Sequence, residues 1–472
     1  MSTLRLDSPI THSQSSTAFV AEFLQVLLQR EVPVSTLRSN YQSLFLESCS
    51  REFAETAPQY LSQALELFAD HVVDESGRSV KSIVENSTQS IQVVVIEGTK
   101  PARPLQLDEA EVASWIENDL AEPAVIDIAR ESIQPNKADI FFAIGAGAEC
   151  APTKPWLLAG GTVAAVMRAN PQRWLELIQL TRNSAGTLMV PVIDGTVDCA
   201  QLSDAELARV AGLDLTGQLE SVASFLRHAI SLSSRKLIVG GLVYIGGAKH
   251  VIAQAAQDAV MRFAEENHHD TVLAWLGTPT DQTPVPLEVL EDAVERFAQR
   301  SLVTRFRDRG FQLFGQCVAP VVDLMTTTHQ TLAIRDCSST LQGPNYIIAK
   351  RAQRWRAFAS ARSGRNVAYI VTPPARTHSV LDYKILHATY RGAPRFGLQP
   401  FGAELTRQLS AASLAYQTEK PVLFDDLDPT AVHLKYAVHA GLWRLKYNPQ
   451  SIWVAATVRG ALALVLPKRI EP

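Results

Sequence analysis

The strongest constraint on the fold of this chain is a series of short, fully apolar runs separated by helical segments. The first run, Ile91–Gly98 (IQVVVIEG), is rich in β-branched residues and ends in glycine, which is typical of a buried parallel strand. Similar runs follow at Pro123–Ala129, Ala138–Gly145 and Gly186–Asp194, with a helical segment before the last of them. This alternation predicts an α/β fold with a doubly wound, Rossmann-like, mostly parallel sheet and right-handed crossovers.

A second stretch in which short apolar runs alternate with helical segments begins near residue 233. It reads as a strand at Lys236–Val239, a glycine turn at Gly240–Gly247, a long helix at Ala248–Glu266 and a strand at Thr271–Leu276. The two stretches are either two related halves or two ordinary βαβ units. The predicted organisation is a helical N-terminal region at 1–88, a first Rossmann-like unit at 89–232, a second at 233–400 and a C-terminal α/β extension at 401–472, where 451–467 has strand character.

The bulk properties exclude several classes of protein. Hydrophobic residues make up 46% of the chain and charged residues 19%, which suits a protein with a core, and the net charge of −4 gives no argument for nucleic acid or an anionic membrane. The five cysteines are scattered and form no CxxC pair, so we expect neither a zinc site nor a disulfide framework. Because the N-terminus lacks an apolar signal core and no run of about 18 apolar residues occurs, a cytoplasmic protein is expected.

Two glycine-rich turns are candidates for contact with a dinucleotide. A glycine turn between a strand and a helix lets backbone N–H groups approach a pyrophosphate. The stronger candidate contains Gly240, Gly241, Gly246 and Gly247, although Tyr244 stands where a nucleotide fingerprint usually has glycine. The second candidate contains Gly145 and Gly147 and is followed by prolines, which favours a loop lining the crevice over a phosphate cradle.

The best catalytic candidates are Ser339, Tyr346 and Lys350. Tyr346 and Lys350 lie four residues apart on a predicted helix and therefore share one face. A tyrosine with a reference pKa of about 10 is a poor base at neutral pH, but a neighbouring ammonium lowers its pKa. Ser339 ends the preceding apolar run and can hold a carbonyl or hydroxyl oxygen of a substrate. A second YxxxK pattern, Tyr416–Lys420, is followed at once by a proline and is interpreted as accidental.

These motifs resemble the active-site region of the short-chain dehydrogenase/reductases. The resemblance covers roughly residues 90 to 380: Ser-Ser at a strand end, Tyr346-x-x-x-Lys350 on a long helix, and then a strand ending in TPPARTHSV, with Thr377 in the place of the family's threonine. VGGLVYIGG is similar to the family's TGxxxGIG turn, and AIGAGAE is similar to its Asn-Ala-Gly strand end. The resemblance implies NADP or NAD as cofactor, Tyr346 as acid/base, Lys350 as its pKa-lowering partner and ribose ligand, and Ser339 as the oxygen holder.

Two functions follow from this sequence. The first is an NAD(P)-dependent reductase or dehydrogenase that moves hydride to or from a small-molecule or carrier-bound carbonyl or hydroxyl substrate. The second is a non-catalytic Rossmann-like scaffold or subunit of a larger biosynthetic assembly, because the motif order departs from the family's: the AIGAGAE strand end precedes the Gly240–Gly247 turn, and Ser339 lies only seven residues before Tyr346. In either case we expect a homo-oligomer or complex subunit with no nucleic acid, membrane or metal partner.

Overall fold

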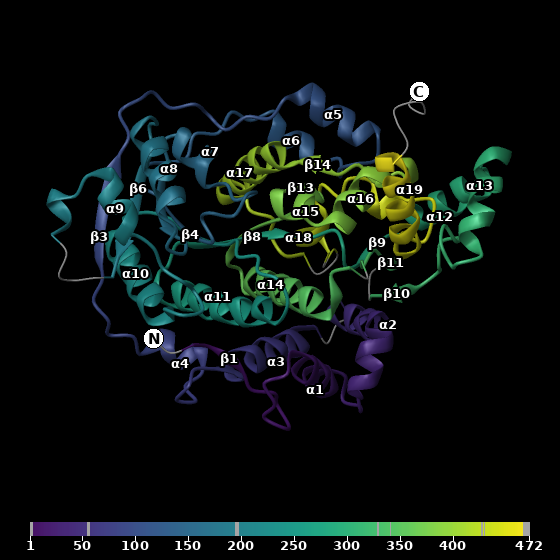
Figure 1. The fold of residues 1–472 in the computed structure, drawn as a ribbon, viewed down its shortest axis with the longest axis horizontal. Coiled ribbons are helices and arrows are strands. Elements are labelled where there is room, and N and C mark those ends of the chain that lie inside the picture. Colours follow the sequence, from purple (N-terminus) through teal and green to yellow (C-terminus); the bar gives the residue numbers. More distant parts are fainter. Residues whose placement is uncertain are drawn as a thin grey trace.

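A mostly parallel β-sheet lies at the centre of the protein (Figure 1). The computed structural model describes residues 3–53, 57–193, 198–327, 330–339, 341–425, 428 and 430–465. Within these residues the sheet has seven strands, in the spatial order β12-β8-β7-β4-β5-β6-β3. Their bounds are β3 Gln92–Glu97, β4 Ile140–Ile144, β5 Thr162–Val166, β6 Thr187–Val192, β7 Leu237–Gly241, β8 Thr271–Gly277 and β12 Asn366–Val371.

The strand order is Rossmann-like and contains one reversal of direction. From β4 the chain steps outward through β5 to β6, and it then returns to place β7 on the other side of β4, followed by β8 and β12. These neighbours pair in parallel, whereas β3 pairs antiparallel with β6 at the edge. In an open α/β sheet the crevice at such a reversal, outside the carboxyl ends of the strands, is where ligands bind. By this rule a ligand site is expected beyond the ends of β4 and β7.

The two predicted units, 89–232 and 233–400, share this one sheet. The first range contributes β3 to β6 and the second contributes β7, β8 and β12. The ends of adjacent strands face each other across the boundary, with Ile144 opposite Gly241 in the pairing of β4 with β7. The interpretation as separate Rossmann-like units is therefore corrected to two halves of a single sheet.

Two predicted strands are helices. Pro123–Ala129 contains α6 (Val125–Ala129), and 451–467 contains α19 (Trp453–Val465). Short apolar runs do not distinguish a buried strand from a buried helix by periodicity, and in both segments packing on neighbouring helices decides. The predicted strand Gly186–Asp194 is β6, but Asp194 lies outside the described residues.

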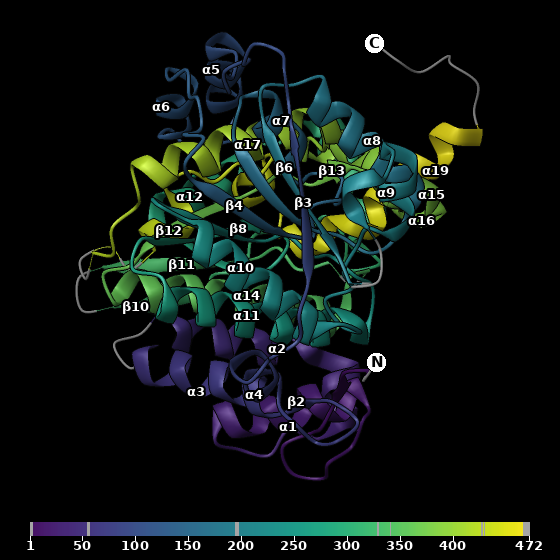
Figure 2. The same cartoon turned by 90° about the vertical axis from the view of Figure 1, so that its left-hand side faces the viewer.

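Helices lie on both sides of the sheet, and the N-terminal region forms a further layer (Figures 1 and 2). On one side, α11 (Ala248–Asn267) and α14 (Gly343–Arg362) lie between the sheet and the N-terminal helices. Aromatic rings hold α14 to the N-terminal helices: the buried indole of Trp355 on α14 stacks on Phe23, with 5.9 Å between the ring centroids. The face of α14 opposite the sheet is thus covered by α1 (Ser16–Leu28), α2 (Val34–Glu52) and α3 (Ala57–Asp70), while α4 (Val80–Glu85) packs on α11.

A long insertion separates β8 from α14. It carries a small antiparallel sheet in the order β10-β11-β9 and two helices, α12 and α13. Its bounds are β9 Gln282–Pro286, α12 Leu287–Ala298, α13 Leu302–Gln312, β10 Leu324–Thr326 and β11 Thr331–Asp336. The insertion explains why the end of β8 and Tyr346 are far apart in the sequence.

The remaining elements complete the two helical layers and the C-terminal part. No helix in the part of the chain that the structure describes is long and apolar enough to cross a membrane. The bounds of the other elements are β1 Arg5–Leu6, β2 Val72–Val73, α5 Glu109–Glu117, α7 Thr153–Leu158, α8 Pro171–Arg182, α9 Asp204–Val210, α10 Leu219–Leu232, β13 Ala375–Arg376, α15 His378–Asp382, α16 Lys384–Gly392, β14 Phe401–Gly402, α17 Ala403–Glu419 and α18 Ala431–Leu434, with 3-10 turns at Cys199–Gln201, Ala393–Phe396, Leu442–Arg444 and Pro449–Ile452.

Candidate functional site

Both glycine turns lie at the point where the strand order reverses. Gly145 and Gly147 follow β4, and Gly240 and Gly241 end β7, its parallel neighbour. The two segments remain in contact where the strands end, because the backbone N–H of Leu242 donates to the carbonyl oxygen of Ile144 at 2.9 Å. The sequence analysis placed the two turns in separate units, whereas the structure places them side by side.

The glycines of the first turn allow close backbone packing. Gly145 has φ +96°, and a Cβ there would meet the backbone of Leu242 and Val243 at 2.9 Å, so only glycine fits without strain. A Cβ on Gly147 would meet the sulfur of Met167. The glycines of this turn thus fit closely against Leu242, Val243 and Met167, so packing against the protein itself accounts for the need for small residues here.

The four glycines of the second turn divide into two pairs. Gly240 and Gly241 are buried within β7, where a Cβ would meet the ring of Phe141 or the side chain of Gln257. Gly246 and Gly247 precede α11, and a Cβ at either position would meet nothing within 4 Å. The first pair permits strand packing, and the second borders open space at the start of the helix.

Tyr346 lies on the first turns of α14 and reaches the end of β8. Its hydroxyl interacts with the side chains of Thr278 and Thr280, which are themselves joined by a hydrogen bond of 2.8 Å. Burial raises the pKa of Tyr346 well above 10, while the two threonine hydroxyls act in the opposite direction. At neutral pH this phenol therefore holds its proton and can donate it.

Lys350 lies one turn further along α14 and also points at β8. Its ammonium donates to the carbonyl oxygen of Leu276 at 2.9 Å and to Oε1 of Gln353 at 3.1 Å. Burial lowers the pKa of Lys350 to about 8. The expected lowering of the tyrosine pKa by this lysine does not occur, because desolvation of Tyr346 outweighs the favourable interactions.

Ser339 is not the partner of Tyr346. Its hydroxyl accepts from the backbone N–H of Leu341 at 3.3 Å, and its carbonyl oxygen accepts from the hydroxyl of Tyr41 at 3.5 Å. Ser339 thus belongs to the turn that leads into α14. The position expected for it beside the tyrosine is taken by Thr278 and Thr280, which directly follow a buried parallel strand in the sequence GTPTD.

Two further aromatic residues flank Tyr346. The ring of Tyr244, from the second glycine turn, lies 5.9 Å from that of Tyr346, and the imidazole of His250 on α11 lies 5.7 Å from it. Burial and the charge of Lys350 lower the pKa of His250 to about 3, so this imidazole is neutral. His250 is buried, and its Nε2 has no hydrogen-bond partner within the described residues. The sequence signal that could have identified His250 is its position three residues after Gly247, on the helix that follows a glycine turn.

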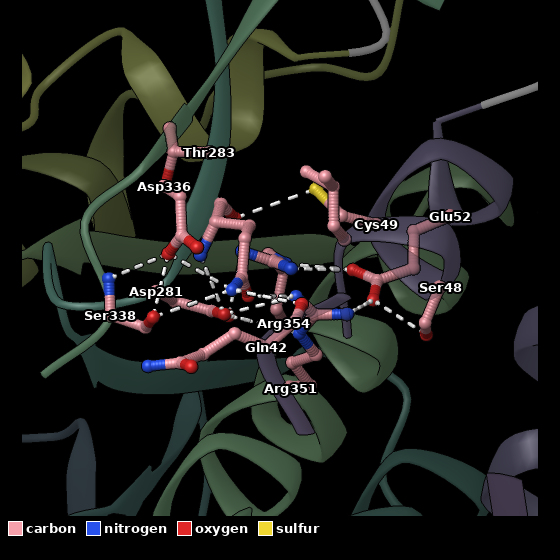
Figure 3. A network of polar contacts seen from close by, with 12 residues as sticks. Gln42, Ser48, Cys49, Glu52, Asp281, Thr283, Asp336, Ser338, Arg351 and Arg354 are labelled. Atoms are coloured by element: carbon pink, nitrogen blue, oxygen red, sulfur yellow. Dashed lines mark hydrogen bonds and ion pairs between the residues drawn. The ribbon is translucent and has the colours of Figure 1, made fainter. Parts of the chain in front are cut away.

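A buried ion network next to this site joins α14 to the N-terminal region and to the loop after β8 (Figure 3). Arg351 donates through Nε and Nη2 to Asp281 at 3.0–3.2 Å and through Nη1 to Glu52 at 2.8 Å. Arg354 donates to the same glutamate at 2.6 and 3.1 Å. All four side chains are at least 98% buried. Since Asp281 directly follows Thr280, the network fixes the loop that carries the hydroxyl partners of Tyr346.

The end of β5 carries a cation. In a Rossmann-like fold the residue after the second strand, about 20 residues beyond the glycine turn, contacts the ribose 2′ position. Counted from β4, this position follows Val166 and is occupied by Met167 and the exposed Arg168. Because Gly240–Gly247 is the stronger candidate turn in the sequence, Arg168 is not among the predicted site residues.

The described residues hold no group of three or more His, Cys, Asp or Glu side chains that could bind a metal ion. In comparisons with known proteins, no family model matches the chain and no curated protein sequence matches it. Function is therefore inferred from the geometry of the site.

Proposed function

We propose that this protein is an NADP-dependent reductase or dehydrogenase with a doubly wound sheet similar to that of the short-chain dehydrogenase/reductases. It would move hydride between a nicotinamide and a carbonyl or hydroxyl group of a small or carrier-bound substrate. The observation that carries this proposal is the convergence of Tyr346, Lys350 and Thr278 at the end of β8, beside the turns that follow β4 and β7.

The strand order supports the proposal because it accounts for the order in which the two glycine motifs occur along the chain. The resemblance requires the glycine turn to precede the Asn-Ala-Gly strand end. Gly145 and Gly147 follow β4, which takes the first position in the Rossmann order, and Gly240–Gly247 follow β7, which takes the fourth. With the roles of the two turns exchanged, the order along the chain agrees with the family's. Thr278 then takes the role first given to Ser339.

The residues around the crevice fit a dinucleotide. Gly246 and Gly247 leave space at the start of α11, where a pyrophosphate would meet the N-terminus of the helix, while Gly145 and Gly147 pack against the protein itself. Arg168 would accept a 2′-phosphate, and the segment after β5 offers no acid for an unphosphorylated ribose. We therefore favour NADP over NAD.

The bound cofactor would supply or accept the hydride. In the reductive direction the hydroxyls of Thr278 and Thr280 would hold the carbonyl oxygen of the substrate beside Tyr346. The phenol, which keeps its proton because burial raises its pKa, would donate that proton to the oxygen as negative charge develops there. Lys350, one turn away, would act as the ligand of the cofactor's ribose hydroxyls, since burial of Tyr346 outweighs any lowering of the phenol pKa by this ammonium.

The test is NADPH oxidation with a panel of ketones, aldehydes and β-keto thioesters. We expect Tyr346→Phe to reduce kcat/KM by about 100- to 10,000-fold, the usual contribution of a general acid, without loss of NADPH binding. Tyr416→Phe is the matched control, because Tyr416 begins the second YxxxK pattern on α17, away from the crevice. Turnover that survives Tyr346→Phe unchanged would refute the catalytic assignment.

A non-catalytic scaffold is the second candidate, and one observation favours it. The ammonium of Lys350 donates to Leu276 and Gln353, and the pKa of Tyr346 stays high. Both features are expected of a site that has lost its activity. The scaffold function predicts no NADPH binding and no turnover with any carbonyl in the panel.

A further inference from the structure

Helix α13 (Leu302–Gln312) exposes an unusual amount of apolar surface. It belongs to the insertion between β8 and α14 and projects from the end of the molecule opposite β3 (Figure 1). Large apolar side chains on this helix and the turn after it are at least 80% exposed, far more than a soluble protein needs to leave in water. They are Leu302, Val303, Phe306, Leu313 and Phe314.

These five side chains lie on one face. At 3.6 residues per turn Leu302, Val303 and Phe306 fall within about a third of the helix circumference, and Leu313 and Phe314 follow in the turn at its end. The opposite face packs on the protein: Asp308 is buried and accepts from Arg300 at 2.7 Å and from the hydroxyl of Tyr447 at 3.1 Å, and Phe311 packs on Phe396. The orientation of α13 is therefore fixed by its inner face, and the outer apolar stripe has no partner among the described residues.

Arginines flank the stripe on both sides. Arg305 and Arg309 are exposed on one flank, and Arg307 on the other is partly exposed and pairs with Asp308 at 2.7 Å. Asp308, the one acid between Ser301 and Gln316, points inward and is paired, so the outward charge is wholly positive. This local charge is opposite in sign to the net charge of −4 of the whole chain.

The charges disfavour a second copy of the chain as the occupant of this face. A two-fold axis would pack the two α13 helices antiparallel and would bring the Arg305 and Arg309 flank of each copy against the same flank of the other. Like charges facing each other across an interface oppose association. An apolar stripe flanked by arginines on a projecting helix instead matches a helix that lies in the headgroup region of an anionic membrane.

We infer that α13 and the following turn form a docking surface for an anionic phospholipid bilayer. Phe306, Phe314, Leu302 and their neighbours enter the boundary between headgroups and acyl chains, and the flanking arginines contact lipid phosphates. The protein would then be held at a membrane surface without spanning it. This inference is independent of the proposed reductase activity, and its test does not use that activity.

The experiment is flotation of the full chain with phosphatidylcholine vesicles, with and without phosphatidylglycerol. We expect binding to the anionic vesicles. The double variant F306S/F314S should reduce the partition coefficient by about tenfold or more for each aromatic ring removed. R305Q/R309Q should reduce it by about fivefold per charge on anionic vesicles only.

The control variant is Leu232→Ser, which replaces an exposed leucine on α10 and should bind as the wild type does. Unchanged thermal unfolding of the variants would show that they fold. The inference is overturned if anionic vesicles do not bind the protein, if F306S/F314S binds as well as the wild type, or if light scattering shows a dimer that this variant converts to a monomer.

Discussion

The buried network between α2 and α14 predicts a large loss of stability when Glu52 becomes glutamine. The carboxylate accepts three charge-assisted hydrogen bonds, from Arg351 at 2.8 Å and from Arg354 at 2.6 and 3.1 Å. The amide keeps one acceptor oxygen, turns an NH2 group toward a guanidinium donor and leaves one buried positive charge uncompensated. Breaking one partner of a buried ion pair costs about 3–5 kcal/mol, and we expect Glu52→Gln to fall in this range. Such a loss is a large part of the free energy of unfolding of a folded domain, which is typically about 5–15 kcal/mol.

The assay is urea unfolding followed by circular dichroism, with the same substitution at Glu47 as the control. Glu47 lies on the same helix and pairs with Arg30, but both side chains are more than a third exposed. Exposed pairs contribute about 1 kcal/mol or less, so Glu47→Gln should shift the midpoint only slightly. The reasoning is refuted if Glu52→Gln and Glu47→Gln cost the same free energy of unfolding, or if Glu52→Gln costs less than about 1 kcal/mol.

Two further predictions concern stability. The pKa of His250 is lowered to about 3, so the unfolded chain binds a proton there below pH 6.5 while the folded chain does not, and acid destabilises the fold. Going from pH 7 to pH 5 should therefore cost the wild type about 2 kcal/mol more than His250→Gln, measured by urea unfolding at each pH, and equal losses would contradict the assignment. A Cβ on Gly460, where α19 crosses α16, would clash with the carbonyl oxygen of Ala388, so Gly460→Ala should lower the free energy of unfolding by about 3 kcal/mol or more. Gly310→Ala on α13, where a Cβ meets nothing within 4 Å, should be neutral or stabilise by up to about 1 kcal/mol, and thermal unfolding that ranks the two variants the other way would exclude this packing.

The sequence predicts the fold better than the assembly of the site. The α/β class and the buried strands follow from apolar, β-branched runs, since parallel strands covered on both faces have this texture. The pairing of β7 with β4 does not follow, because nothing local in Leu237–Gly241 specifies its neighbour in space. The apolar segment that becomes α19 is equally ambiguous until Gly460 packs against α16.

The candidates Tyr346 and Lys350 stand out in the sequence because their spacing on one helix face is a local pattern, and the structure places both on α14. Thr278 could not, since the insertion of 282–342 separates it from the tyrosine and Ser339 offers a nearer hydroxyl in the sequence. The pKa of Tyr346 also depends on burial, which only the packed structure provides. The arginine at position 168 becomes meaningful once β5 is known to be the second strand of the Rossmann order.

The most direct test of the central claim is a fluorescence titration of the protein with NADPH. The account predicts saturable binding, weaker binding of NADH, loss of the preference for NADPH in Arg168→Glu, and loss of binding in Gly145→Val, whose side chain would meet the backbone of Leu242. No saturable change up to about 1 mM NADPH, a concentration that detects even weak complexes, would contradict the claim that the crevice between β4 and β7 holds a dinucleotide.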